Sequence, residues 1–190
     1  MDNRGFTLIE LVIVIGIVGV LTGGMVFYSR SAERQIILFR DQAKIVEALL
    51  RAKSLTISTY SDIDASCGYG VSFNEPRKAI IIFKDLAINP DCSDADNQYR
   101  FNGVDGDYTC DIGDPALNEC VEKLTLDDQT IEFSSLTLRD IVYIPPNPDI
   151  MIDNDIAKQS ASIEIKTVET TGAAVKKIIT ITNNGQITTQ

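Results

Sequence analysis

The first thirty residues constrain this chain more than any other part of it. A short polar leader, Met1–Gly5, precedes an apolar run from Phe6 to Tyr28 that contains a single carboxylate, Glu10. As a helix rising about 1.5 Å per residue, the run reaches roughly 33 Å, which is enough to cross the hydrocarbon core of a membrane. An ionisable side chain at that depth costs roughly 2.5–3.5 kcal/mol, so it normally has a partner and a function. A plain membrane anchor does not account for Glu10.

The stretch Gly5–Glu10 reads Gly-Phe-Thr-Leu-Ile-Glu. It resembles the prepilin signature of type IV pilins and type II secretion pseudopilins. The resemblance implies that a prepilin peptidase/methyltransferase cuts between Gly5 and Phe6 and methylates the new terminus at Phe6. It also implies that Glu10 serves assembly, its carboxylate meeting the terminal amine of a neighbouring subunit. One departure is that the leader holds a single basic residue, Arg4, beside Asp2.

The resemblance further implies where such a chain resides and what it meets. It predicts a single-pass inner (cytoplasmic) membrane protein with an extracytoplasmic head, which joins a filament in the periplasm or at the cell surface. The implied partners are other pilin or pseudopilin subunits, the peptidase, an inner-membrane assembly platform and membrane lipid.

Net charge bears on which partners are expected. The chain carries a formal charge of −10 at pH 7. All of the excess negative charge lies between Asp85 and Asp128, a segment that contains twelve acidic residues and two basic ones. The rest of the chain is balanced. An acidic surface repels phosphate backbones, so nucleic acid is not an expected partner.

Catalytic chemistry finds little support. The chain has no histidine, which excludes Ser-His-Asp and Cys-His systems and histidine metal ligands. No Gly-rich phosphate loop is present either, so we do not expect an enzyme. The four cysteines, Cys67, Cys92, Cys110 and Cys120, show no C-x-x-C spacing and predict two structural disulfides. Of the three pairings open to them, we favour Cys67–Cys92 with Cys110–Cys120.

The helical pattern continues beyond the apolar run, and no proline occurs before Pro76. One helix is therefore expected from Phe6 to about Thr59. Its second half is amphipathic, with one apolar face predicted to pack on the head. The residues assigned to that face are Ile36, Phe39, Ala43, Val46, Leu50 and Ile57.

Strand-like patterns follow the helix. A hairpin is predicted from Tyr69–Phe73 and Ala79–Lys84, and Asn184-Gly185 predicts another near the end of the chain. The other expected strands are Tyr99–Asn102, Glu122–Leu126, Thr130–Ser134, Ile141–Ile144, Ser162–Thr167, Val175–Thr182 and Gln186–Thr189. The predicted fold class is α+β, a long N-terminal helix packed on an antiparallel, two-sheet β head.

The predicted organisation is a leader at 1–5, a transmembrane half-helix at 6–28, an amphipathic half-helix at 29–59 and a β head at 60–190, with an acidic loop at 85–128. Within the prepilin class, three stretches are similar to the H-type minor pseudopilins and the FimT-type minor pilins. They are Leu50–Ser54, Tyr69–Phe73 and Ile179–Ile187.

A further hypothesis concerns a bound metal ion. Major pseudopilins often hold calcium, and aspartates crowd the acidic loop, so Ca²⁺ is the one cofactor weighed, with candidate ligands Asp105, Asp107, Asp111 and Asp114. The alternative is a solvated acidic loop and no cofactor, because the EF-hand pattern is incomplete.

The sequence favours a structural subunit, a minor pilin or pseudopilin of a type IV pilus-like or type II secretion filament. One alternative is a DNA-binding minor pilin of an uptake apparatus, which would use Lys166, Lys176 and Lys177. The other is a membrane-anchored extracytoplasmic binding protein.

Overall fold

The structure is a computed structural model that describes residues 7–59, 66–87, 89, 92–101, 104–105, 110, 118–126, 130–146, 149–168 and 174–190, with backbone alone at 26–32, 59, 101 and 104–105. The chain divides into two compact units, Met1–Ile36 and Ile37–Gln190. Each is described by itself, and the second is called the head.

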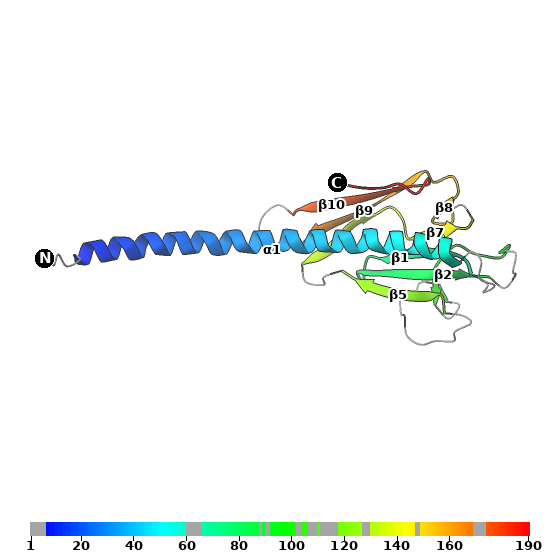
Figure 1. Ribbon diagram of the computed structural model, residues 1–190, viewed down its shortest axis with the longest axis horizontal. Helices are drawn as coiled ribbons and strands as arrows, with labels where there is room; N and C mark the ends of the chain where they lie inside the picture. The colour runs from blue at the N-terminus through cyan, green and yellow to red at the C-terminus, as the bar shows by residue number, and fades with distance from the viewer. Residues whose placement is uncertain are drawn as a thin grey trace. The chain divides into compact units, whose positions relative to one another are not determined.

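Helix α1 spans Leu8–Thr59, close to the bounds that the sequence predicts. No proline interrupts it, and the only glycines, Gly16, Gly19, Gly23 and Gly24, lie in its apolar first part. Residues 37–59 of α1 belong to the head, where they run along strands of both larger sheets (Figure 1). The predicted α+β class is confirmed.

The head contains a five-stranded sheet in the order β5-β2-β1-β7-β8, a four-stranded sheet in the order β11-β10-β9-β6 and the short pair β3-β4. All pairings are antiparallel. The strands are β1 (Ser66–Asn74), β2 (Ala79–Leu86), β3 (Arg100–Phe101), β4 (Val104–Asp105), β5 (Cys120–Thr125), β6 (Ile131–Leu136), β7 (Asp140–Ile144), β8 (Asp149–Ile152), β9 (Ser160–Thr167), β10 (Lys176–Thr182) and β11 (Ile187–Thr189).

Both predicted hairpins are confirmed. Strands β1 and β2 pair across a turn in which the Asn74 side chain accepts a hydrogen bond from the backbone N–H of Arg77 at 2.8 Å. Strands β10 and β11 pair across a turn in which Gly185 has φ of 80°, a conformation that glycine adopts at little cost. Strand β8 is an addition to the prediction.

The main core lies where α1 meets both sheets. Buried apolar side chains of β1, β2, β7 and β8 from one sheet, and of β6, β9 and β10 from the other, form one cluster with the helix. The helix contributes Leu38, Ile45, Ala48, Leu49 and Ala52. Polar contacts flank this core, because Arg51 pairs with Glu122 of β5 and the Lys44 ammonium donates to the Thr125 carbonyl at 3.1 Å.

The packing face of the helix differs from the prediction. Val46 is partly buried and packs against the main core, as predicted. The other predicted residues are exposed, namely Ile36, Phe39, Ala43, Leu50 and Ile57. The buried face is instead the set Leu38, Ile45, Ala48, Leu49 and Ala52. This part of α1 is apolar on two faces, and helical periodicity cannot say which of them a sheet will cover.

A second, smaller core lies on the other face of the five-stranded sheet. Along β2, Ile80 and Ile82 belong to the main core, whereas Ile81 and Phe83 pack with Tyr99 and with Val142 of β7. The rings of Phe83 and Tyr99 have centroids 5.5 Å apart. Because side chains alternate along a strand, this face continues to Asp85.

The turn after β8 carries a carboxylate whose charge stabilises the head. Asp153 Oδ1 accepts hydrogen bonds from the backbone N–H groups of Arg139 (2.6 Å) and Asp140 (3.0 Å), and Oδ2 contacts the Lys158 ammonium at 2.5 Å. Burial raises the pKa of Asp153, but the hydrogen bonds from Lys158, Arg139 and Asp140 outweigh it and hold the pKa below its ordinary value.

A depressed pKa in the folded state means that the stabilisation is present above the ordinary aspartate pKa and is lost as the pH falls through the folded value. We expect Asp153→Asn to lower the free energy of unfolding by about 1 kcal/mol at pH 7 and by a smaller amount at pH 3, which lies below the ordinary aspartate pKa. Urea unfolding of the full chain in detergent at both pH values measures this. Asp149→Asn, in the same hairpin but exposed, is the control. An equal loss at both pH values would contradict the assignment.

Candidate functional site

The start of α1 is fixed by a local cap. The hydroxyl of Thr7 accepts a hydrogen bond from the backbone N–H of Glu10 at 3.4 Å, and the Thr7 carbonyl accepts one from Leu11 at 3.2 Å. Threonine followed three residues later by glutamate is the capping-box pattern, which the sequence interpretation above overlooked. The cap places Glu10 in the first turn, where the helix dipole favours a negative charge.

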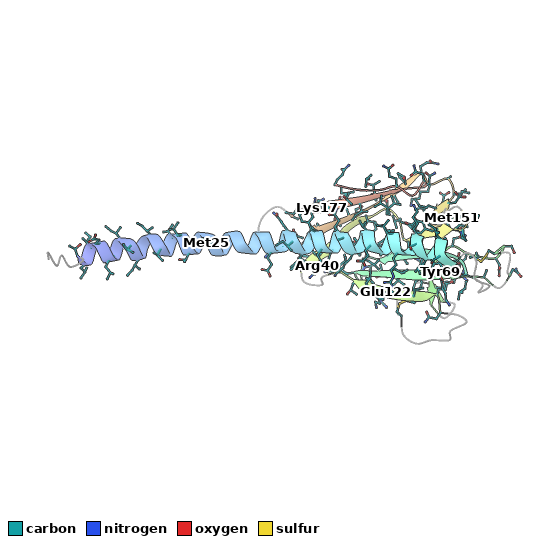
Figure 2. All side chains as sticks on the ribbon, in the orientation of Figure 1. Met25, Arg40, Tyr69, Glu122, Met151 and Lys177 are labelled. Carbon is teal, nitrogen blue, oxygen red and sulfur yellow. A yellow bond between two sulfur atoms is a disulfide. The ribbon has the colours of Figure 1, made fainter. Side chains whose placement is uncertain are left out.

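Glu10 stands on a helix that is otherwise apolar. The segment Leu8–Met25 has a mean hydropathy of 2.3 and none of it is buried. Its side chains stand out around the helix axis (Figure 2). By length and composition this helix could cross a membrane, although an N-terminal signal sequence would meet the same test. Among the described residues, none forms a hydrogen bond or ion pair with the Glu10 carboxylate.

The other polar and small residues of this segment fit an apolar environment. The Thr22 hydroxyl donates to the carbonyl oxygens of Val18 (2.6 Å) and Gly19 (3.2 Å), so its polar group is satisfied within the helix. Apart from its chain neighbours and the adjacent backbone of the same helix, a methyl group added at any of the four glycines of α1 would meet no described atom within 4 Å. That space is therefore open to a second helix.

The predicted processing residues, Gly5 and Phe6, lie outside the described residues. Of the residues implied by the resemblance, the structure therefore places only Glu10. It adds the capping residue Thr7 to them.

The exposed apolar face of α1 forms a second feature of the head. Phe39, Val46 and Leu50 line a shallow groove together with Gln42, Ala43, Glu47, Arg51, Ser54 and Thr189. Phe39 is 54% exposed and Leu50 53%. These exposed apolar side chains make the groove a candidate contact surface.

The three lysines considered for DNA binding all have partners. Lys166 pairs with Glu132 at 3.0 Å and Lys176 with Glu164 at 2.7 Å. The hydrogen bonds from Lys176 and Ser134 lower the pKa of Glu164. The ammonium of Lys177 lies 4.6 Å from the ring centroid of Phe39. These contacts do not favour a basic stripe that is free to bind phosphates.

Disulfides join Cys67 to Cys92 and Cys110 to Cys120. Of the proposed calcium ligands, Asp107, Asp111 and Asp114 lie outside the described residues, and Asp105 is described only as backbone of β4.

The structure brings together a different set of carboxylates. One oxygen each of Asp85, Asp96 and Glu119 lies within 4.8 Å of the others. Burial, and then the charge of Asp96, raises the pKa of Asp85 to about 7. Burial likewise raises the pKa of Glu119 to about 8, although hydrogen bonds from the backbone N–H groups of Arg100 and Leu86 oppose the shift. These three residues are called the carboxylate cluster.

Comparison with known proteins bears on the N-terminal segment alone. Residues 1–26 match the family model described as the prokaryotic N-terminal methylation motif. The comparison with curated proteins finds no match, and neither does the comparison with solved structures. The match covers the leader, Thr7, Glu10 and most of the apolar run, and supports the resemblance to type IV pilin-like chains. The chain thus begins with a prokaryotic N-terminal methylation motif.

Proposed function

We propose that this chain is a non-enzymatic structural subunit, a minor pilin or pseudopilin of a type IV pilus-like or type II secretion filament. One observation carries the proposal. The segment that matches the methylation motif forms an unburied apolar helix whose only charged side chain, Glu10, sits in the first turn. Such a surface requires a covering of lipid or of other helices, and such a carboxylate requires a cation.

The mechanism follows from the charge at the helix start. Removal of Met1–Gly5 frees a positive amine at Phe6. In an apolar setting, that amine and Glu10 of an adjacent subunit neutralise each other, whereas either charge alone would be strongly penalised. The cap from Thr7 holds Glu10 near the terminus, where a neighbouring amine can reach it. The open space at the four glycines allows the helices to approach closely.

The head offers a second contact of the same kind. The groove along Phe39, Val46 and Leu50 is apolar and faces outward, and a helix of a neighbouring subunit is the occupant that we propose for it. The groove lies on α1, the element whose first part carries the motif. Two assembly surfaces on one helix support a subunit that packs among helices rather than an anchored monomer that binds ligands.

In this account the precursor is a single-pass inner-membrane protein with an extracytoplasmic head. Its partners are the prepilin peptidase/methyltransferase, the assembly platform, lipid and sister subunits. The H-type minor pseudopilin or FimT-type minor pilin is the subfamily that we favour, from the loose matches in the head. Both disulfides fit an oxidising compartment.

Processing tests the proposal. Co-expressed with a prepilin peptidase, the full chain should lose Met1–Gly5, and the intact mass should show Phe6 as the first residue. We expect Gly5→Leu to stay uncut, because a bulky side chain replaces the glycine at the cleavage position. Asn3→Leu, which introduces the same side chain two residues earlier, should be cut normally. Cleavage beyond the apolar run, as a signal peptidase would produce, would contradict the proposal.

A further inference from the structure

The carboxylate cluster assembles groups that are far apart in the sequence. Asp85 comes from β2, on the face that carries Ile81 and Phe83 and lies away from α1. Glu119 directly precedes β5, and its carbonyl accepts the backbone N–H of Lys84 at 2.8 Å. Asp96 lies in the segment before β3. Each disulfide has one cysteine near a residue of the cluster: Cys120 of the Cys110–Cys120 bond adjoins Glu119, and Cys92 of the Cys67–Cys92 bond lies four residues before Asp96.

Backbone N–H groups hold the cluster in place. Asp85 Oδ2 accepts from Asn97 at 3.2 Å, and Asp96 Oδ1 accepts from Gln98 at 3.1 Å. Glu119 accepts from Leu86 through Oε1 and from Arg100 through Oε2. These hydrogen bonds fix the positions of the carboxylates, as a metal site requires. Each of these oxygens keeps a second lone pair, which is available to bind an ion.

Two oxygens of the cluster accept no hydrogen bond from the described part of the chain, Asp85 Oδ1 and Asp96 Oδ2, and of these Asp96 Oδ2 lies beside the Arg100 guanidinium. The Asp85 side chain is 0% exposed, and one of its oxygens lies within 4.8 Å of an oxygen of each of the other two groups. Its Oδ1 accepts no hydrogen bond from any residue that the structure describes. Glu119 is 5% exposed, so solvent access there is also small. A buried carboxylate oxygen with no donor carries a large desolvation penalty. A ligand supplied from outside the chain would remove that penalty.

The charges indicate what kind of ligand this is. Arg100 is the cation described at the cluster, and its Nε forms an ion pair with Asp96 Oδ2. With all three groups deprotonated, three carboxylates and one guanidinium leave two negative charges, which a divalent cation neutralises. Oxygens that all lie within 4.8 Å of one another are close enough to bind one ion at about 2.4 Å, the distance typical of Ca²⁺.

We propose that Asp85, Asp96 and Glu119 form a divalent-cation site that takes Ca²⁺, with water completing the coordination. Carboxylate oxygens are hard ligands that suit Ca²⁺. Softer metals are not favoured, because the chain has no histidine and its four cysteines are joined in disulfides. The ion would fasten the segment before β3 and the start of β5 to β2. The inference rests on the head alone and does not depend on filament assembly.

Calcium titration of the full chain tests the site. The chain is stripped with EDTA, held in non-ionic detergent at pH 8, and titrated with CaCl₂ by calorimetry and by thermal unfolding. We expect a saturable binding heat with a Kd of about 1 mM or tighter, and a rise in the Tm of the head of about 5 °C at saturation. No heat and no rise in Tm would overturn the proposal.

Matched variants show whether the cluster is the site. Asp85→Asn and Glu119→Gln keep the side-chain shape, and each should abolish the calcium-dependent rise in Tm. Asp149→Asn, an exposed change on β8, should retain the full rise. The Tm without calcium shows that each variant is folded. A rise that survives in both cluster variants would overturn this assignment and place calcium elsewhere, with Asp105, Asp107, Asp111 and Asp114 as the next candidates.

Discussion

Replacing Glu10 by valine should remove this chain from the filament while leaving its processing intact. The substitution takes away the carboxylate that we propose to pair with the Phe6 amine of a neighbouring subunit. The amine would then enter the apolar helix bundle without a counter-ion, at a cost of several kcal/mol. Each 1.4 kcal/mol changes an equilibrium tenfold, so incorporation should fall by at least tenfold. Immunoblots of sheared filament fractions, set against the membrane pool, measure the loss.

Glu33→Val is the matched control, because it makes the same change at an exposed glutamate of the same helix. It should assemble normally. Glu10→Gln separates charge from shape, and we expect it to fail almost as badly as Glu10→Val. Normal assembly of Glu10→Gln would show that the carboxylate charge is not required and would refute the pairing.

Replacing Leu49 by alanine should destabilise the head by about 2–5 kcal/mol, the range for large-to-small changes in a packed core. Leu49 is fully buried in the main core, where α1 meets both sheets. The cavity left by the substitution would remain partly unfilled, because strands hold the opposite side of the core. Urea unfolding of the full chain in detergent gives the change in the free energy of unfolding.

The next residue along the helix is the control. Leu50 is 53% exposed and lines the outward groove, so Leu50→Ala should cost less than about 1 kcal/mol of stability. Its effect should appear in assembly instead, since a neighbouring helix is proposed to cover that groove. Similar losses of stability in Leu49→Ala and Leu50→Ala would contradict the assignment of the two faces.

The local features of the fold could be predicted from the sequence. The bounds of α1 follow from apolar periodicity and the absence of proline, and both hairpins follow from turn residues such as Asn184 and Gly185. Strand β8 was overlooked because it is only four residues long and follows Pro148 directly. Such a segment carries too little periodicity to be distinguished from a loop.

The long-range features could not be predicted in the same way. Strands β5 and β6 are neighbours in the sequence, yet they belong to different sheets. The choice of buried helix face also depends on which strands lie against it, and two apolar faces compete for that role. The prediction for Ile36, Phe39 and Leu50 was wrong for this reason.

The candidate sites also divide into one that the sequence could predict and one that it could not. Glu10 is conspicuous in the sequence because a charge is rare in an apolar run, and the Thr7 cap could have been found from its spacing. The carboxylate cluster could not, since Asp85, Asp96 and Glu119 stand among many other acids. Only the pairing of β2 with β5 and the bonds of the intervening segment bring the three together.

Co-expression of the wild-type chain with Glu10→Val in one cell tests the central claim most directly. The two chains differ in mass, so intact-mass spectrometry gives their ratio in the membrane pool and in the sheared filaments. We predict equal processing of both chains in the membrane and a strong depletion of Glu10→Val in the filaments. The same ratio in both fractions would contradict the claim that Glu10 brings this subunit into the assembly.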